Sequence, residues 1–293
     1  MPLTHPENEL NALIRLLDEP DEHIFVQIAD SIFAWGTAAL PVLKQELTNN
    51  FNPLVEERLN NLIQRIQNEN LYLELTNWVH FGSHDLLKGT ILLARFQYPD
   101  LDELRITQMI GQLTQDVWIE MHDTMLSLDK IKVMNHILFD VHHFTPNPKD
   151  AFALQDMFIQ QVLDVKRGNA LTLGIIYIIL AQGLKIPVYG VDLPHHFILA
   201  CLRNNPLSES GLFDERDVSF YLNPFYRGQI FVSKEIDRYL SEVKLPVKQE
   251  YYAPCSNVRV MMRLAEAMSD AYGKSGNHEK AEALRKLIAS LEV

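Results

Sequence analysis

The feature that most constrains the fold of this chain is a predominantly apolar run from Leu171 to Leu184. A run of this length, followed directly by Lys185, is too short to cross a bilayer as a helix, which needs about 20 apolar residues. A helix formed from it has no polar face, so other elements must cover it on every side. We therefore expect a globular protein built around a buried central helix.

Different patterns flank this helix. Segments before it have helical periodicity, and Asp100 after Pro99 is a plausible N-cap for one of them. Short β-strand signals bounded by turn residues follow it. The clearest helical segments are 86–96, 101–113 and 131–139, and the strand signals are 188–191, 197–202, 220–222 and 229–232. These patterns predict an α+β fold that is mainly α, with a small antiparallel sheet beside a helical body.

The N-terminal region, residues 1–70, contains three apolar helical stripes separated by a turn at Pro20 and Asp21 and by Gly36. Paired helices in this order resemble a HEAT-type repeat, in which antiparallel helices stack sideways. The alternative is an ordinary helical cap without a partner, because one repeat alone is a weak signal.

The C-terminal region, residues 251–293, has helical periodicity on both sides of Gly276 and Asn277. Small residues at the expected helix crossing, and Tyr272 before the turn, resemble a single tetratricopeptide unit. A hairpin that only closes the core is the alternative. Between the two ends, residues 71–250 are predicted to form the core.

The composition excludes some classes of function. The chain of 293 residues carries a formal net charge of −12 and has no long run of Lys and Arg, which disfavours nucleic-acid binding. Only two cysteines occur, so no disulfide framework is expected. We expect no signal peptide, no membrane span and a cytoplasmic location.

Three short motifs carry the chemistry. Arg167 to Ala170 form a turn that leads into the apolar helix, Leu193 to Phe197 present two histidines beside a strand, and Asn223 to Phe225 present an amide. Papain-type sites place their groups in this order, with a nucleophile at a helix N-terminus, a histidine base and an orienting Asp or Asn.

These motifs resemble the transglutaminase-like superfamily, and most closely a bacterial branch with Arg-Gly-x-Pro, Leu-Pro-Gly-His-Phe and Asp-Pro-Phe patterns. The resemblance runs from about Leu86 to Val232, and in that branch a tetratricopeptide-like tail often follows the core. It implies that the nucleophile position falls on Ala170, the base on His196 and the orienting residue on Asn223.

A methyl group at Ala170 cannot attack a carbonyl, so the resemblance implies a triad without its nucleophile. Thr172 lies about 200° around the helix from Ala170 and is expected to face away. Cys201 lies an odd number of residues after His196 on the same strand, which predicts the opposite face of the sheet. Cys255 lies near the C-terminal hairpin. We expect no replacement nucleophile.

The sequence thus predicts a non-catalytic transglutaminase-like protein that binds a protein or peptide, with His195, His196, Asn223 and Arg167 as candidate binding residues. The alternative is a hydrolase or amide-transfer enzyme of atypical mechanism that uses His196 and Asn223. A third hypothesis is a small-molecule binder that uses the same cleft. No cofactor is expected, and no metal-binding motif is present.

Overall fold

The computed structural model describes residues 5–147, 153–203 and 215–291 of the chain. It is mainly helical with two small β-sheets, which confirms the predicted α+β, mainly α class. The chain divides into two compact units, Met1–Thr76 and Asn77–Val293. The three-part division at residues 70 and 250 stays a prediction.

The first unit is a set of packed helices with its own apolar core. Asp21 begins one of them, because its carboxylate accepts hydrogen bonds from the first backbone amides. The buried Arg58 donates to the carbonyl oxygens of Leu17 (2.9 Å) and Glu19 (2.8 Å), which joins the last helix to the first turn. Its elements are α1 (His5–Ile14), α2 (Glu22–Phe33), η1 (Gly36–Ala39), α3 (Leu40–Asn49) and most of α4 (Pro53–Asn77).

The second unit contains the remaining elements. Its helical segments are η2 (Trp78–Gly82), α5 (Leu86–Arg95), α6 (Glu103–Ile119), α7 (Ser127–Asn135), η3 (His136–Val141), η4 (Leu154–Met157), α8 (Ile159–Val165), α9 (Ala170–Gly183), η5 (Glu215–Asp217), η6 (Pro224–Tyr226), α10 (Ser233–Glu242), η7 (Gln249–Tyr251), α11 (Asn257–Lys274) and α12 (His278–Leu291). Its strands are β1 (Thr145–Pro146), β2 (Arg167–Gly168), β3 (Val188–Leu193), β4 (His196–Leu202), β5 (Val218–Asn223) and β6 (Gln229–Phe231).

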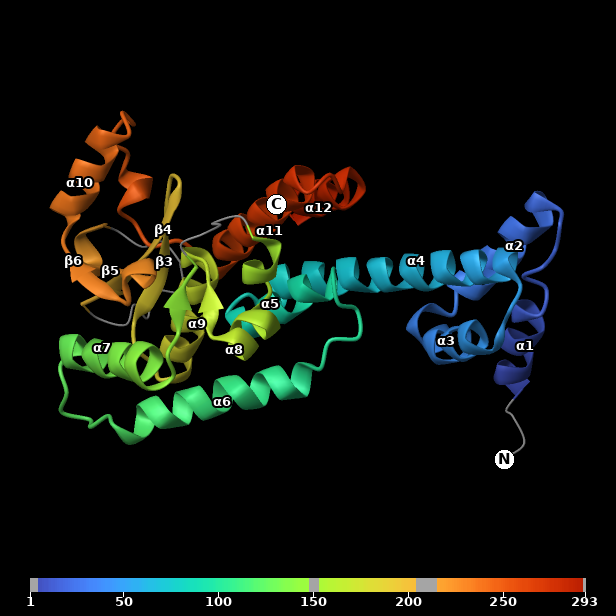
Figure 1. Ribbon diagram of the computed structural model, residues 1–293, viewed down its shortest axis with the longest axis horizontal. Coiled ribbons are helices and arrows are strands. Elements are labelled where there is room, and N and C mark those ends of the chain that lie inside the picture. Colours follow the sequence, from blue (N-terminus) through green and yellow to red (C-terminus); the bar gives the residue numbers. More distant parts are fainter. Residues whose placement is uncertain (1–4, 148–152, 204–214, 292–293) are drawn as a thin grey trace. The chain divides into compact units, whose positions relative to one another are not determined.

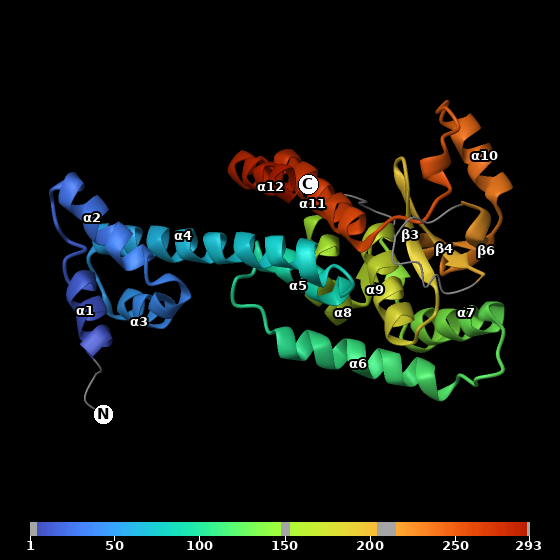
Figure 2. The ribbon, with the colours of Figure 1, turned by 180° about the vertical axis from the view of Figure 1, so that it is seen from behind.

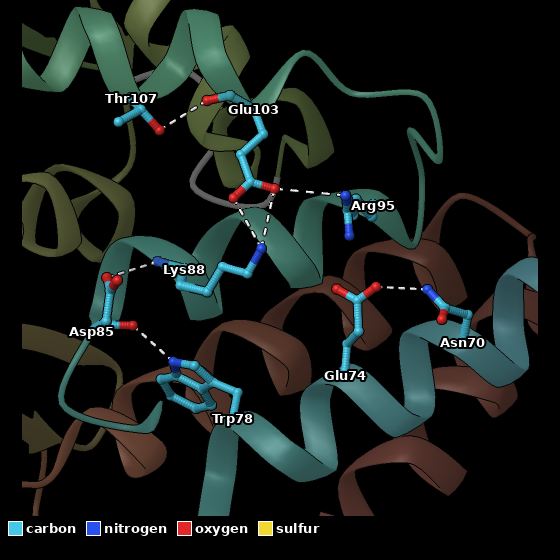
Figure 3. Close-up of polar contacts among 8 residues, drawn as sticks. All are labelled: Asn70, Glu74, Trp78, Asp85, Lys88, Arg95, Glu103 and Thr107. Carbon is cyan, nitrogen blue, oxygen red and sulfur yellow. Dashed lines mark hydrogen bonds and ion pairs between the residues drawn. The ribbon is translucent and has the colours of Figure 1, made fainter. Parts of the chain in front are cut away.

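Polar contacts fix the start of this unit (Figure 3). The indole nitrogen of Trp78 donates to the carbonyl oxygen of Asp85 (2.7 Å), and the Asp85 carboxylate caps α5. Lys88 on α5 forms an ion pair with Glu103 on α6 (2.9 Å). Gly89 leaves room for the Trp78 ring, since a Cβ there would lie 2.5 Å from it.

The main sheet has four antiparallel strands in the order β3-β4-β5-β6. Leu193 pairs with His196, so β3 and β4 are joined by the two-residue turn Pro194–His195. The four strand signals of the sequence match these four strands. A separate pair, β1 and β2, is parallel, and β2 lies just before α9 in the chain.

The central helix α9 covers one face of the main sheet and α10 covers the other (Figures 1 and 2). Leu171 through Ala181 are all buried, as the apolar run predicts. Phe197 of β4 packs against α9 so closely that a Cβ on Gly174 would lie 2.7 Å from its ring. On the other face, Ile198 and Leu202 share a core with Ile236 and Leu240 of α10.

The structure tests two further predictions about helices. Helix α6 begins after Asp102, whose side chain accepts from the Arg105 amide, so the prediction that Asp100 is the N-cap was wrong. The C-terminal region is a helical hairpin, α11 and α12, as predicted.

No single helix among the described residues is long and apolar enough to cross a membrane. The helices Glu22–Phe33 and Gly36–Asn49 meet the length and composition requirement only as a pair bent by 104°.

Candidate functional site

A cleft of about 440 Å³ lies between the sheet and α10, and both His196 and Asn223 line it. Strand alternation explains why they meet, because Asn223 extends the face of β5 that carries Tyr221, which pairs with Ala200 on the His196 face of β4. The full lining is Leu193, His196, Ile198, Asn223, Tyr226, Gln229, Phe231, Glu235, Ile236, Arg238, Tyr239 and Glu242.

The His196 ring is solvent-exposed on one side and packs edge-on against Tyr239 of α10, with ring centroids 4.9 Å apart and planes at 68°. Partial burial, and secondarily the neighbouring His195, lower the pKa of His196 below its usual value of 6.5. The imidazole is therefore neutral at pH 7. Neither of its ring nitrogens has a hydrogen-bond partner among the described residues.

Asn223 has a local structural role. Its Oδ1 atom accepts hydrogen bonds from the backbone amides of Phe225 (3.0 Å) and Tyr226 (3.3 Å), which starts the short helix η6. The side-chain oxygen is thus occupied, and Asn223 does not hydrogen-bond His196 in the part of the chain that the structure describes. Contact with Tyr239, and not with Asn223, positions the imidazole.

The turn that presents the two histidines is held from both sides. Tyr239 donates its hydroxyl to the Pro194 carbonyl oxygen (2.8 Å), and Arg263 of α11 donates to the His196 carbonyl oxygen (3.0 Å). His195 sits at the second turn position with φ of 61°, a conformation that favours glycine. A histidine at this position therefore costs about 1–2 kcal/mol of backbone strain.

Arg263 belongs to a larger ion-pair cluster. Asp192 of β3 accepts from Arg263 and from the Nε atom of Arg259 (2.6 Å), and Arg259 also pairs with Glu266 (2.8 Å). The side chains of Asp192 and Arg263 are only 18% and 19% exposed, so they form a largely buried pair. Asp192, Arg259 and Arg263 of this cluster line a second hollow of about 610 Å³ beside α11.

The other predicted residues lie elsewhere. Ala170 is the first residue of α9, the helix that packs on the Phe197 face of the sheet, whereas His196 faces α10. Arg167 is exposed on β2 and does not line the cleft. The structure therefore brings His196 and Asn223 together, with His195 in the adjoining turn, and leaves Ala170 and Arg167 outside the cleft.

Neither cysteine has the lowered pKa that is typical of a nucleophilic thiol. Cys201 is fully buried on the α9 face, and burial raises its pKa to about 11. Burial raises the pKa of Cys255 to about 12. The Oγ1 atom of Thr172 is buried and has no hydrogen-bond partner among the described residues, so no base activates it.

The described residues contain no group of three or more His, Cys, Asp or Glu side chains placed to hold a metal ion.

Sequence reasoning missed Tyr239, Asp192 and Arg263. Arg259 and Arg263 are four apart, so a signal for two arginines on one helical face was present. Nothing in the sequence showed that Asp192 would be their partner, because that contact joins β3 to α11 across the fold.

Comparison with known proteins identifies the family of this chain. Residues 105–266 match the transglutaminase-like superfamily. A UPF0162 protein of Xylella fastidiosa (strain 9a5c) is 22% identical over 202 residues, which cover 67% of this chain and 68% of that protein. No solved structure matches the chain significantly.

Other relatives match shorter parts of their own length. The UPF0162 protein PM0557 of Pasteurella multocida is 28% identical over 98 residues, covering 33% of this chain and 37% of that protein. F-box only protein 21 of Homo sapiens is 22% identical over 175 residues, covering 60% of this chain and 26% of that protein. The chain therefore matches well under half the length of these two relatives.

Proposed function

Because the chain belongs to the transglutaminase-like superfamily, we propose that it is a non-catalytic member that binds a protein or peptide in the cleft beside α10. The observation that supports this proposal is that His196 and Asn223 line the cleft, whereas Ala170, the first residue of α9, does not. Acyl transfer through a covalent intermediate requires a nucleophile within hydrogen-bond reach of its base. Here the nucleophile position has a methyl group and is not part of the cleft lining.

The lining of the cleft supports the same proposal. Among the described residues, those that form the cleft include no cysteine, serine or threonine. They combine apolar side chains with exposed polar ones, and Tyr226 is 60% exposed at its edge. Apolar surface with a few polar groups is typical of a recognition site.

The two ends of the chain extend this proposal. We infer a HEAT-type repeat from the order of helices in the first unit, and one tetratricopeptide unit from the hairpin of α11 and α12. Repeats of both kinds present helical faces to protein partners. In the proposed function these ends add contact surface for the same class of partner.

A second candidate function is a hydrolase or amide-transfer enzyme of atypical mechanism. The observation that favours it is the lowered pKa of His196, since a neutral imidazole at pH 7 accepts a proton from water. Asn223 gives it little support, because its side-chain oxygen already caps η6.

Site-specific photo-crosslinking tests the binding function. A photoreactive phenylalanine replaces Tyr226 at the edge of the cleft, and a matched protein carries it at Trp118, which is 67% exposed on α6. We expect one specific protein from native lysate to crosslink at position 226, and unlabelled wild-type protein to compete for it. Equal crosslinking at both positions would contradict the proposal.

Hydrolysis assays separate the two functions. The wild-type protein and His196→Ala are compared on amide and ester probes. Non-catalytic binding predicts no turnover above the buffer rate for either protein. Turnover by the wild type that is lost in His196→Ala would establish the enzyme instead.

A further inference from the structure

The cleft beside α10 has aromatic walls. The rings of His196, Tyr226, Phe231 and Tyr239 come from β4, η6, β6 and α10 and line one hollow. The faces of the Phe and Tyr rings are electron-rich and attract cations, and aromatic rings also pack against aliphatic chains. A ligand with an alkyl stem and a cationic end satisfies both properties.

The floor of the cleft suits an alkyl stem. Leu193, Ile198 and Ile236 line it, and each of these side chains is at most 3% exposed. Lysine and arginine side chains bury their methylene groups along apolar surface of this kind and keep the charged end outside.

The charged groups of the cleft are mostly negative. Glu235 and Glu242 line it together with one cation, Arg238, which lies 4.0 Å from Glu242. The carboxylate of Glu235 also accepts from the Val232 amide (3.3 Å) at the start of α10, which fixes its place. Its negative charge has no cationic partner in the described part of the chain.

No other group in the cleft reverses this balance. His196 is neutral at pH 7 and adds no positive charge. The chain as a whole has a formal net charge of −12, so its field also attracts cations. An acidic ligand meets repulsion here, and a wholly apolar ligand desolvates Glu235 without compensation.

We propose that the cleft recognises a basic side chain, lysine or arginine, of the protein or peptide partner. The alkyl stem lies on the Ile198 floor, the aromatic rings surround the cation, and Glu235 pairs with it. This inference rests on the proposed binding function and names the chemistry of the residue that is bound.

Short blocked peptides test it on the full-length protein. The probes are acetyl-Gly-Gly-X-Gly-Gly-amide peptides in which X is lysine, norleucine or glutamate, and the readout is the NMR signal of the 13C-labelled His196 ring, assigned with His196→Gln. We expect saturable shifts with the lysine peptide. Norleucine keeps the stem without the charge, so it should bind about tenfold more weakly, and glutamate should not bind.

Variants locate the effect. Glu235→Gln keeps the acceptor at the Val232 amide and removes the charge, so it should weaken lysine-peptide binding about threefold to tenfold. Tyr226→Leu should weaken it by a similar factor. The matched controls Glu120→Gln and Trp118→Leu at the end of α6 should leave the affinity unchanged.

The outcomes separate this inference from the proposed function. Equal binding of the lysine and norleucine peptides, or no loss in Glu235→Gln, overturns the recognition of a basic side chain. Absence of any peptide binding also overturns it, and a partner crosslinked at position 226 then still supports the binding function. If neither peptides nor a crosslinked partner are found, both proposals fail.

Discussion

The two faces of the four-stranded sheet differ although they come from the same strands. The α9 face is closed, because Phe197 packs on Gly174 and Gly190 so tightly that a Cβ at either glycine would lie 2.7 Å from its ring. The α10 face is apolar at its centre and opens into a cleft at His196. Adjacent residues of one strand, His196 and Phe197, thus belong to two different environments.

We therefore expect the α9 face to determine stability and the α10 face to determine recognition. The contacts on the α9 face are buried and leave no space for a ligand. A substitution there disturbs close packing and therefore affects stability. On the α10 face the polar residues lie at the edge, where they remain accessible. The following changes test that contrast, from the largest expected effect to the smallest.

Phe197→Ala should lower the free energy of unfolding by about 3–5 kcal/mol, because it removes a buried ring and leaves a cavity beside Gly174. His196→Ala, the neighbouring change on the other face, should alter it by less than about 0.5 kcal/mol. Urea denaturation followed by circular dichroism measures both. Similar losses in the two variants would remove the distinction between the faces.

Arg263→Gln should lower the free energy of unfolding by about 1–3 kcal/mol, because it breaks the largely buried pair with Asp192. It should also shift the NMR signal of the His196 ring, since Arg263 holds the His196 carbonyl oxygen. The control Arg285→Gln breaks an exposed pair with Glu282 and should cost less than about 0.5 kcal/mol. A loss of stability without a change at His196 would show that the cluster does not position the turn.

His195→Gly should raise the free energy of unfolding by about 0.5–1 kcal/mol, since glycine adopts a φ of 61° without strain. It should also raise the pKa of His196, because the charge of His195 contributes to lowering it. Urea denaturation and an NMR pH titration check the two parts. A destabilised variant would mean that the His195 side chain makes a stabilising contact.

The lowered pKa of His196 predicts a pH dependence of stability. Below the ordinary value of 6.5 the unfolded chain binds a proton at this site more readily than the folded chain. The contribution of His196 is therefore complete above pH 6.5 and is lost as the pH falls through the folded pKa. Comparing the wild type with His196→Gln at about pH 7.5 and about pH 5 should show a smaller acid loss in the variant.

The Ala170→Cys variant should show no effect of His196 at all. Helix α9 should lower the pKa of a thiol at its first residue, but that residue does not line the cleft, where the His196 ring packs against Tyr239. Alkylation rates of Ala170→Cys with and without His196→Ala should agree within about twofold. A much lower alkylation rate in the double variant would instead support the triad geometry that the family resemblance implies.

Much of the fold was predictable from periodicity. The apolar run before Lys185, the four strand signals and the hairpin around Gly276 all correspond to elements of the structure. Helix starts were harder, because Asp100 and Asp102 are equally good caps in sequence, and the structure uses Asp102.

The site was predictable only in part. The motifs located His196 and Asn223, and alternation along β4 correctly placed Cys201 away from His196. The ring contact between His196 and Tyr239 could not be predicted in the same way, because Tyr239 comes from a helix that no motif linked to the cleft.

The sequence by itself determined the family, the buried central helix and the methyl group at Ala170, because each depends on residue identity or local periodicity. Only the tertiary structure decided that His196 faces α10 while α9 packs against Phe197, and that Asp192 joins Arg259 and Arg263. The physical reason is that strand direction and helix packing set which face a side chain joins. Those are long-range contacts, and local sequence does not encode them.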